Sequence, residues 1–170
     1  MYTIQPFLTI STNRIATTVV ITMICLLSGI PAHSQKYDFV NLNIEHGLVQ
    51  SQINNIAQDQ FGMLWIATLG GISRFDGKEF SNFNYGKGLV QSMTEVIYPD
   101  RKNRIWIGQE SSIQLFEGQE FKLYNISCSP GRKNVVDLTQ APDGDIYALI
   151  FGGQLCKLSD SSRNFNAVYK

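Results

Sequence analysis

The sequence is poor in charge, cysteine and histidine, and each shortage excludes a class of protein. Charged residues make up 16% of the 170 residues, and 14 basic and 14 acidic side chains cancel to a formal net charge of zero. This balance excludes a basic nucleic-acid-binding surface, so no nucleic-acid partner is expected through this chain. With three cysteines and two histidines, a metal cluster or a Ser-His-Asp triad is hard to build. We therefore expect no catalytic residue, no metal and no cofactor on this chain.

The composition that remains is typical of an all-β or secreted protein. Charged content lies below the average of about 25% for soluble domains. Aromatic residues reach 11%, and there are 14 glycines. A length of 170 residues suits one domain by the usual prior of about 100–200 residues.

Residues 1–34 have the features of an export signal. They contain no acidic residue and one cation, Arg14, which precedes an apolar stretch from Ile15 to Ile30. The small residues Ala32 and Ser34 follow with the spacing that signal peptidase recognises. The apolar core is shorter than the ~20 residues that cross a bilayer comfortably. We expect a cleaved signal peptide and a periplasmic or extracellular protein, with a retained membrane anchor as the alternative.

Cleavage at that site leaves two cysteines, Cys128 and Cys156. In an oxidising compartment they could form a disulfide. The sequence does not give the separation of their Cα atoms, so a disulfide and two free thiols both stay open.

The most informative feature is an internal repeat of 41 residues. Residues 47–83 align without a gap with residues 88–124, and a weaker third copy follows over 129–170. Positions that recur at this offset include Asp59 and Asp100, Gly77 and Gly118, and Trp65, Trp106 and Tyr147. A fixed period of about 40–45 residues indicates a repeat architecture.

Each period contains four short strands. In the first copy the alternation of apolar and polar residues and the turn residues predict strands over 52–58, 64–68, 72–75 and 79–83. Gly62, Asn103 and Gly144 stand at a turn position that favours positive φ, and Gly77 and Gly118 follow an acidic residue in two-residue hairpin signals. Four antiparallel strands per repeat predict about three β-propeller blades.

The recurring residues have a plain structural interpretation. Trp65, Trp106 and Tyr147 are predicted to fill the space between adjacent blades. Asp59 and Asp100 stand at turns, where hydrogen bonding to the turn backbone is favoured over catalysis or calcium binding.

These strings resemble the two-component regulator propeller repeat. The resemblance rests on GL-x-x-S from Gly47, on QD-x-x-G-x-LWI from Gln58, and on GGI-x-RFDG-x-x-F from Gly70. It fades in the third copy, where Ala141 replaces the Asp, Tyr147 the Trp and Lys157 an aromatic residue. The resemblance also implies an N-terminal strand over 35–46 that leads into repeats over 47–87, 88–128 and 129–170.

The resemblance implies a sensor region. The family forms the extracytoplasmic part of bacterial membrane-bound regulators, especially in the Bacteroidota, whose output module is a histidine kinase or a DNA-binding regulator. Full-length relatives are anchored in the inner membrane. The alternatives are a secreted or periplasmic interaction or secretion-accessory protein and, less favoured, a fragment of a propeller lyase or hydrolase.

Two further expectations concern partners. Three blades do not close a ring, since propellers typically have 4–8 blades. We expect the N-terminal part of a larger propeller, with assembly of two or three copies as the alternative. The ligand is unknown; the resemblance implies an oligosaccharide, bound near loops 69–72, 86–91 and 109–112.

Overall fold

The computed structural model describes residues 12–27, 39–159 and 163–168, and the chain divides into two units, 1–40 and 41–170. The first unit contains α1 (Thr12–Leu27), which falls in the apolar part of the expected export signal. In the described part of the chain, we find no helix that is both long and apolar enough to cross a membrane. The predicted cleavage site around Ala32 and Ser34 lies outside the described residues.

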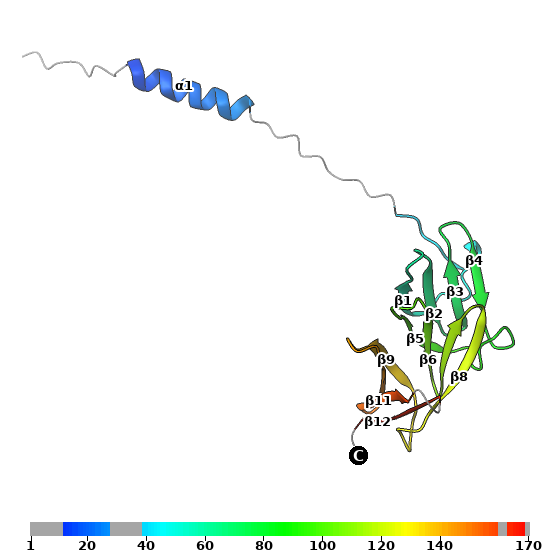
Figure 1. Cartoon of the computed structure of the whole chain (residues 1–170). Coiled ribbons are helices and arrows are strands. Elements are labelled where there is room, and N and C mark those ends of the chain that lie inside the picture. Colours follow the sequence, from blue (N-terminus) through cyan, green and yellow to red (C-terminus); the bar gives the residue numbers. More distant parts are fainter. Residues whose placement is uncertain (1–11, 28–38, 160–162, 169–170) are drawn as a thin grey trace, which may run out of the picture. The chain divides into compact units, whose positions relative to one another are not determined.

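The second unit consists of three four-stranded antiparallel groups, here called blades 1, 2 and 3 (Figure 1). Blade 1 contains β1 (Ile53–Gln58), β2 (Leu64–Thr68), β3 (Gly71–Phe75) and β4 (Phe80–Phe83). Blade 2 contains β5 (Thr94–Pro99), β6 (Ile105–Gln109), β7 (Ile113–Glu117) and β8 (Glu120–Ile126). Blade 3 contains β9 (Val135–Gln140), β10 (Ile146–Ile150), β11 (Gln154–Ser159) and β12 (Asn164–Ala167). The prediction of an all-β chain built from four-stranded repeats is confirmed.

The segment before blade 1 differs from the prediction. A strand was expected over 35–46, but residues 39–43 have no regular secondary structure and Ile44–His46 form a short 3-10 helix, η1. The Asn43 side chain caps this helix by accepting a hydrogen bond from the Glu45 backbone N–H at 2.9 Å. Residues 39–46 belong to neither described sheet, and a local side-chain cap satisfies backbone groups instead. Residues 35–38 of the expected strand lie outside the described residues.

Blades 1 and 2 pack through opposite sides of their sheets. Successive side chains of a strand point to opposite faces, so each blade has a leading face toward the preceding blade and a trailing face toward the next. The trailing face of blade 1 presents Trp65, Ala67 and Ile72, and the leading face of blade 2 presents Ile97, Ile105 and Ile107. All six side chains are buried, so the second-strand tryptophan does fill the space between these blades.

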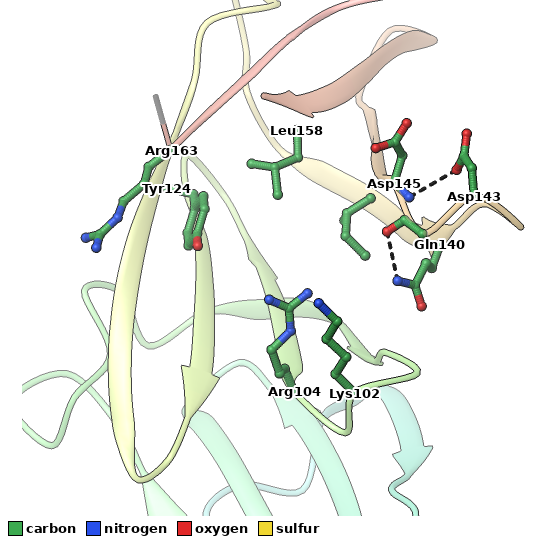
Figure 2. A pocket seen from close by; sticks show the side chains of 10 residues that line it. Lys102, Arg104, Tyr124, Gln140, Asp143, Asp145, Leu158 and Arg163 are labelled. Atoms are coloured by element: carbon green, nitrogen blue, oxygen red, sulfur yellow. Dashed lines mark hydrogen bonds between the residues drawn. The ribbon is translucent and has the colours of Figure 1, made fainter. Parts of the chain in front are cut away.

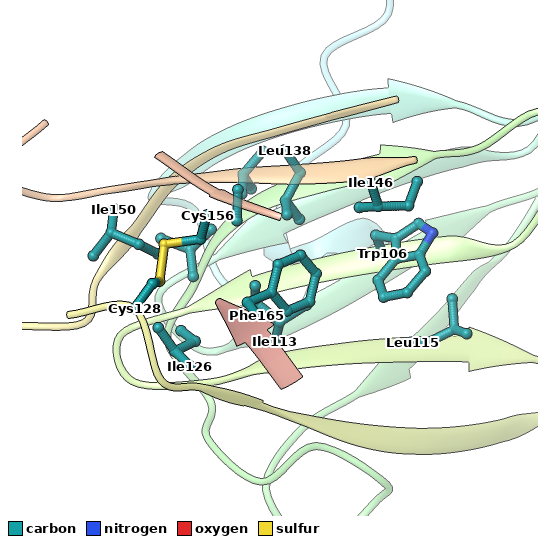
Figure 3. Close-up of a cluster of buried hydrophobic side chains, with 13 residues drawn as sticks. Trp106, Ile113, Leu115, Ile126, Cys128, Leu138, Ile146, Ile150, Cys156 and Phe165 are labelled. Atoms are coloured by element: carbon teal, nitrogen blue, oxygen red, sulfur yellow. A yellow bond between two sulfur atoms is a disulfide. The ribbon is translucent and has the colours of Figure 1, made fainter. Parts of the chain in front are cut away.

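Blades 2 and 3 enclose a second core, which Figure 3 shows. Trp106 and Ile113 of blade 2 pack with Phe165 and Ile146 of blade 3. At the outer edge β12 pairs in parallel with β8 through Phe165 and Ile126, so the two blades share one eight-stranded sheet. This pairing was not predicted, because it joins strands that are not neighbours in sequence.

A disulfide between Cys128 and Cys156 lies within this second core (Figure 3). The two Cα atoms are 5.9 Å apart, inside the range that a disulfide requires. The bond joins the connection after β8 to β11, and it settles the alternative that the sequence left open.

The third repeat contains one extra residue, which corrects one assignment. Trp106 pairs with Leu115 across β6 and β7, whereas Tyr147 pairs with Lys157 across β10 and β11. Lys157 therefore stands at the position of Leu115. Leu158, and not Lys157, takes the place of the aromatic residue, because the insertion in the β10–β11 loop shifts the register by one.

Removal of the disulfide is expected to destabilise the second unit by about 3–4 kcal/mol, the chain-entropy value for a loop of this length; the two cysteines are 28 residues apart. Urea unfolding with and without reductant measures the difference. The Cys128→Ser/Cys156→Ser variant should be equally destabilised and insensitive to reductant. Wild-type protein whose unfolding midpoint does not move on reduction would contradict the prediction.

Candidate ligand-binding site

In blade 1 a carboxylate ties a tight turn to the core tryptophan. The Asp59 Oδ1 atom accepts hydrogen bonds from the backbone N–H groups of Phe61 at 2.9 Å and Met63 at 3.1 Å. Its Oδ2 atom accepts from the Trp65 Nε1–H at 2.9 Å. Gly62 completes the turn with φ of +82°. The carboxylate thus fixes both the β1–β2 turn and the orientation of the indole ring.

Blade 2 repeats this arrangement in a more buried setting. Asp100 is 2% exposed and accepts from the backbone N–H of Lys102, the backbone N–H of Arg104 and the Trp106 Nε1–H at 2.9, 2.9 and 3.0 Å. The Arg104 Nε–H donates to Oδ2 at 2.7 Å. Burial acts to raise the pKa of Asp100, but these hydrogen bonds outweigh it and hold the pKa below its ordinary value.

Blade 3 lacks the carboxylate that accepts the indole N–H of the core tryptophan in blades 1 and 2. Ala141 stands where the other blades have Asp, and Tyr147 replaces the tryptophan. The Lys157 ammonium lies 5.8 Å from the centre of the Tyr147 ring and forms an ion pair with Asp145. Arg74 stands at the equivalent position of blade 1, with its guanidinium 5.5 Å from the Trp65 ring centre. Blade 3 therefore keeps a cation beside its aromatic ring and lacks the carboxylate bond.

Except for Tyr147, the residues singled out from the repeat lie in turns or between blades. Tyr147 is partly buried on the trailing face of blade 3, which no described blade covers. Gly77 and Gly118 sit in the β3–β4 and β7–β8 hairpins with φ of +98° and +58°. Together with the two aspartates, Gly62 and the aromatic trio, they organise the blades and do not line the hollow described below.

The loops expected near a ligand lie at the other ends of the strands. Gln91 connects two of them: its Nε2–H donates to Ser111 Oγ at 2.9 Å, and its Oε1 accepts from the Ser111 N–H at 3.2 Å. In blade 1 the backbone N–H of Leu69 donates to the carbonyl of Gln52 at 3.3 Å. In both blades the connection between the second and third strand is bonded to the segment that enters the blade.

A hollow of about 470 Å³ opens beside these loops, where the first strands of the three blades begin. Its lining residues are Ile53, Asn54, Glu95, Asn134, Val135, Val136 and Phe151. Asn54, Glu95 and Val136 occupy the same position of the repeat, one on each of β1, β5 and β9. The inner strands of all three blades therefore contribute to one wall.

The lining combines hydrogen-bonding groups with an exposed ring. The Asn54 amide donates to the Glu95 carboxylate at 3.4 Å. The buried Asn134 Oδ1 atom has no hydrogen-bond partner among the described residues. Phe151 is 57% exposed, and the Arg132 guanidinium lies 5.3 Å from its ring centre. These groups suit a ligand that offers hydroxyl donors and a flat apolar surface.

Asn134 and Phe151 were not found from the sequence. Neither recurs at the repeat offset, and Phe151 lies in the loop that contains the inserted residue. The insertion itself was the available signal, because an extra residue in a loop between repeat strands often marks a binding surface.

The fold and the repeats define a class of protein, the β-propeller. A family model described as two component regulator propeller matches residues 47–70, and no curated protein matches the chain. The chain thus carries the repeat of the two-component regulator propeller family, and the predicted resemblance is confirmed.

Solved structures have the same fold. The extracellular domain of a proposed hybrid two component system, BT3049 from B. thetaiotaomicron, matches with a TM-score of 0.63 and 19% identity over 76% of this chain. The extracellular domain of a proposed one component system, BT4673 from the same organism, matches at 0.60 with 15% identity over 78%. This chain spans 18% of the length of each domain. Virginiamycin B lyase from Staphylococcus aureus matches at 0.57 with 15% identity, covering 68% of this chain and 41% of the lyase.

Replacing the buried carboxylate is expected to cost about 2–4 kcal/mol of unfolding free energy, since Asp100→Ala leaves the buried Trp106 N–H and two backbone N–H groups without an acceptor. Urea unfolding measures the loss. Asp76→Ala is the matched control, because that hairpin carboxylate accepts two backbone hydrogen bonds but is exposed; its loss should be much smaller. Equal losses of unfolding free energy in the two variants would contradict a stabilising role for the buried Asp100 hydrogen bonds.

The Asp100 hydrogen bonds also make the free energy of unfolding depend on pH. Because the folded-state pKa of Asp100 is lowered, its contribution is present above the ordinary carboxyl pKa of about 4 and is lost as the pH falls through the folded-state value. The stability difference between wild type and Asp100→Asn should therefore shrink in acid.

Proposed function

We propose that this chain is a ligand-binding propeller region of an extracytoplasmic sensor in a two-component system. The observation that carries the proposal is the hollow to which β1, β5 and β9 each contribute the same repeat position. A site built from several blades can couple ligand binding to the arrangement of the blades. The fold likeness to extracellular domains of such systems supports this function and a periplasmic or extracellular location.

The groups in the hollow favour an oligosaccharide. The Glu95 carboxylate can accept hydrogen bonds from sugar hydroxyls. The exposed Phe151 ring can pack against the apolar face of a sugar ring. The hollow contains a single carboxylate, Glu95, whereas glycoside hydrolysis usually needs two. We therefore propose binding without catalysis, with any kinase activity on a separate output module.

An oligosaccharide array probed with the full chain tests this function. The best-retained oligosaccharide is then titrated by calorimetry. Phe151→Ala should weaken its binding about tenfold or more, because the buried ring contributes roughly 1.5–3 kcal/mol. Phe61→Ala is the matched control, since Phe61 is 80% exposed at the opposite end of β1 and is absent from the hollow. Retention of no oligosaccharide, or equal effects of both variants, would count against the proposal.

Comparison of equivalent repeat positions also shows that the leading face of blade 1 is uncovered. Ile56 on the leading face of blade 1 is 57% exposed, whereas its counterpart Ile97 on blade 2 is 3% exposed because blade 1 covers it. We propose that another blade, with a tryptophan on its second strand as in Trp65, covers Ile56 in the assembled sensor.

Blade 3 of a second copy is a less suitable partner. In blades 1 and 2 the turn residues Gln60 and Arg101 donate backbone N–H groups to Asn103 Oδ1 and Gln140 Oε1 of the next blade, at 2.8 and 3.0 Å. The third copy has Pro142 at this position, and proline has no N–H to donate. This difference favours a further blade over head-to-tail copies.

Maleimide labelling of Ile56→Cys distinguishes a covered from an uncovered leading face. The cysteine should be protected in envelopes of the source cells and reactive in the isolated chain. Phe61→Cys should be reactive in both, and the unsubstituted chain gives the background. Equal reactivity of Ile56→Cys in both preparations would rule out the covering blade.

A further inference from the structure

A second hollow, of about 400 Å³, lies between blades 2 and 3 (Figure 2). It adjoins the β5–β6 and β9–β10 turns, so it lies at the opposite ends of β5 and β9 from the proposed oligosaccharide site. Its volume is within the range of about 300–1,000 Å³ that is usual for small-molecule sites. Neither the family repeat nor the proposed function involves it.

One side of this hollow is cationic. Lys102 from the β5–β6 turn and Arg104 just before β6 place their cationic groups side by side there (Figure 2). Tyr124 of β8 and Arg163 before β12 complete the lining, with the Arg163 guanidinium on the far side of Tyr124. Arg104 is held in place because its Nε–H donates to Asp100 and its guanidinium lies 5.5 Å from the Trp106 ring centre. Within the described ranges Lys102 and Arg163 form no ion pair. Their charges are therefore available to an anion.

The opposite side offers acceptors rather than a third cation. Gln140 is fixed by two bonds, from its Nε2–H to the Gly144 carbonyl at 2.8 Å and from the Arg101 N–H to its Oε1 at 3.0 Å. Asp143 accepts the Asp145 N–H on Oδ1 at 3.1 Å, which leaves Oδ2 free to accept another donor. A ligand that fits both sides must carry a negative charge at one end and hydrogen-bond donors at the other.

We propose that this hollow binds a small hydroxylated carboxylate. The carboxylate contacts the Lys102 ammonium and the neighbouring Arg104 guanidinium (Figure 2), whose charge-assisted hydrogen bonds are the strong type, and the Tyr124 hydroxyl can donate a further bond. The hydroxyl groups of the ligand donate to the Asp143 carboxylate. Asp143 repels an anion without donors, so the hollow discriminates against simple inorganic anions.

Gluconate and sorbitol are the matched probes, because gluconate has a carboxylate where sorbitol has a hydroxymethyl group. Ligand-observed NMR with the full chain should show binding of gluconate and not of sorbitol. Lys102→Gln should weaken gluconate binding about tenfold, as a lost charge-assisted bond predicts. Arg163→Gln should have a smaller effect because its charge acts from a greater distance, and added salt should weaken binding further. Lys87→Gln, an exposed lysine outside the hollow, is the control and should leave binding unchanged.

The variants also separate this site from the proposed oligosaccharide site. Phe151→Ala should leave gluconate binding unchanged, and Lys102→Gln should leave oligosaccharide binding unchanged. Equal binding of sorbitol and gluconate, gluconate binding insensitive to both substitutions, or Lys102-dependent binding of inorganic phosphate without gluconate would each overturn the assignment.

Discussion

The packing of a second-strand tryptophan into the next blade is the interaction on which the rest of this structure depends. A single four-stranded sheet of this size cannot bury both of its faces, so each blade is stable only against a neighbour. Trp65 meets the isoleucines of blade 2 on one side, and Trp106 meets blade 3 on the other. The exposed Ile56 follows from the same rule, because no described blade covers the leading face of blade 1.

Around this packing, the turns that the aspartates hold and the loops beside the larger hollow lie at opposite ends of the strands. Asp59 accepts three hydrogen bonds from the β1–β2 turn and the Trp65 indole. Asp100 accepts four from the β5–β6 turn, the Arg104 side chain and the Trp106 indole. These turns therefore cannot change freely without disturbing the core. At the other ends the loops are held by individually different contacts, such as those of Gln91 with Ser111, so their side chains can change with the ligand.

Local features of this fold could be predicted from the sequence, and non-local ones could not. The strands and the positive-φ turn at Gly62 depend on short-range pattern and backbone sterics, and the structure has both. The β8–β12 pairing and the Cys128–Cys156 distance depend on how blade 3 approaches blade 2, which no local pattern encodes. The hollow with Asn134 and Phe151 was missed for the same reason. Residues 39–46, the described part of the predicted N-terminal strand, form no strand and end in a short 3-10 helix.

The third repeat has lost interactions that the first two repeats share. In blade 3, Ala141 and Tyr147 have lost the carboxylate–indole bond, and Pro142 has lost the N–H that the equivalent residues donate to the next blade. Residues of the same blade, Phe151 at one end and Asp143 at the other, line the two candidate binding sites. β12 and the disulfide hold this blade against blade 2. That attachment compensates for the lost repeat interactions.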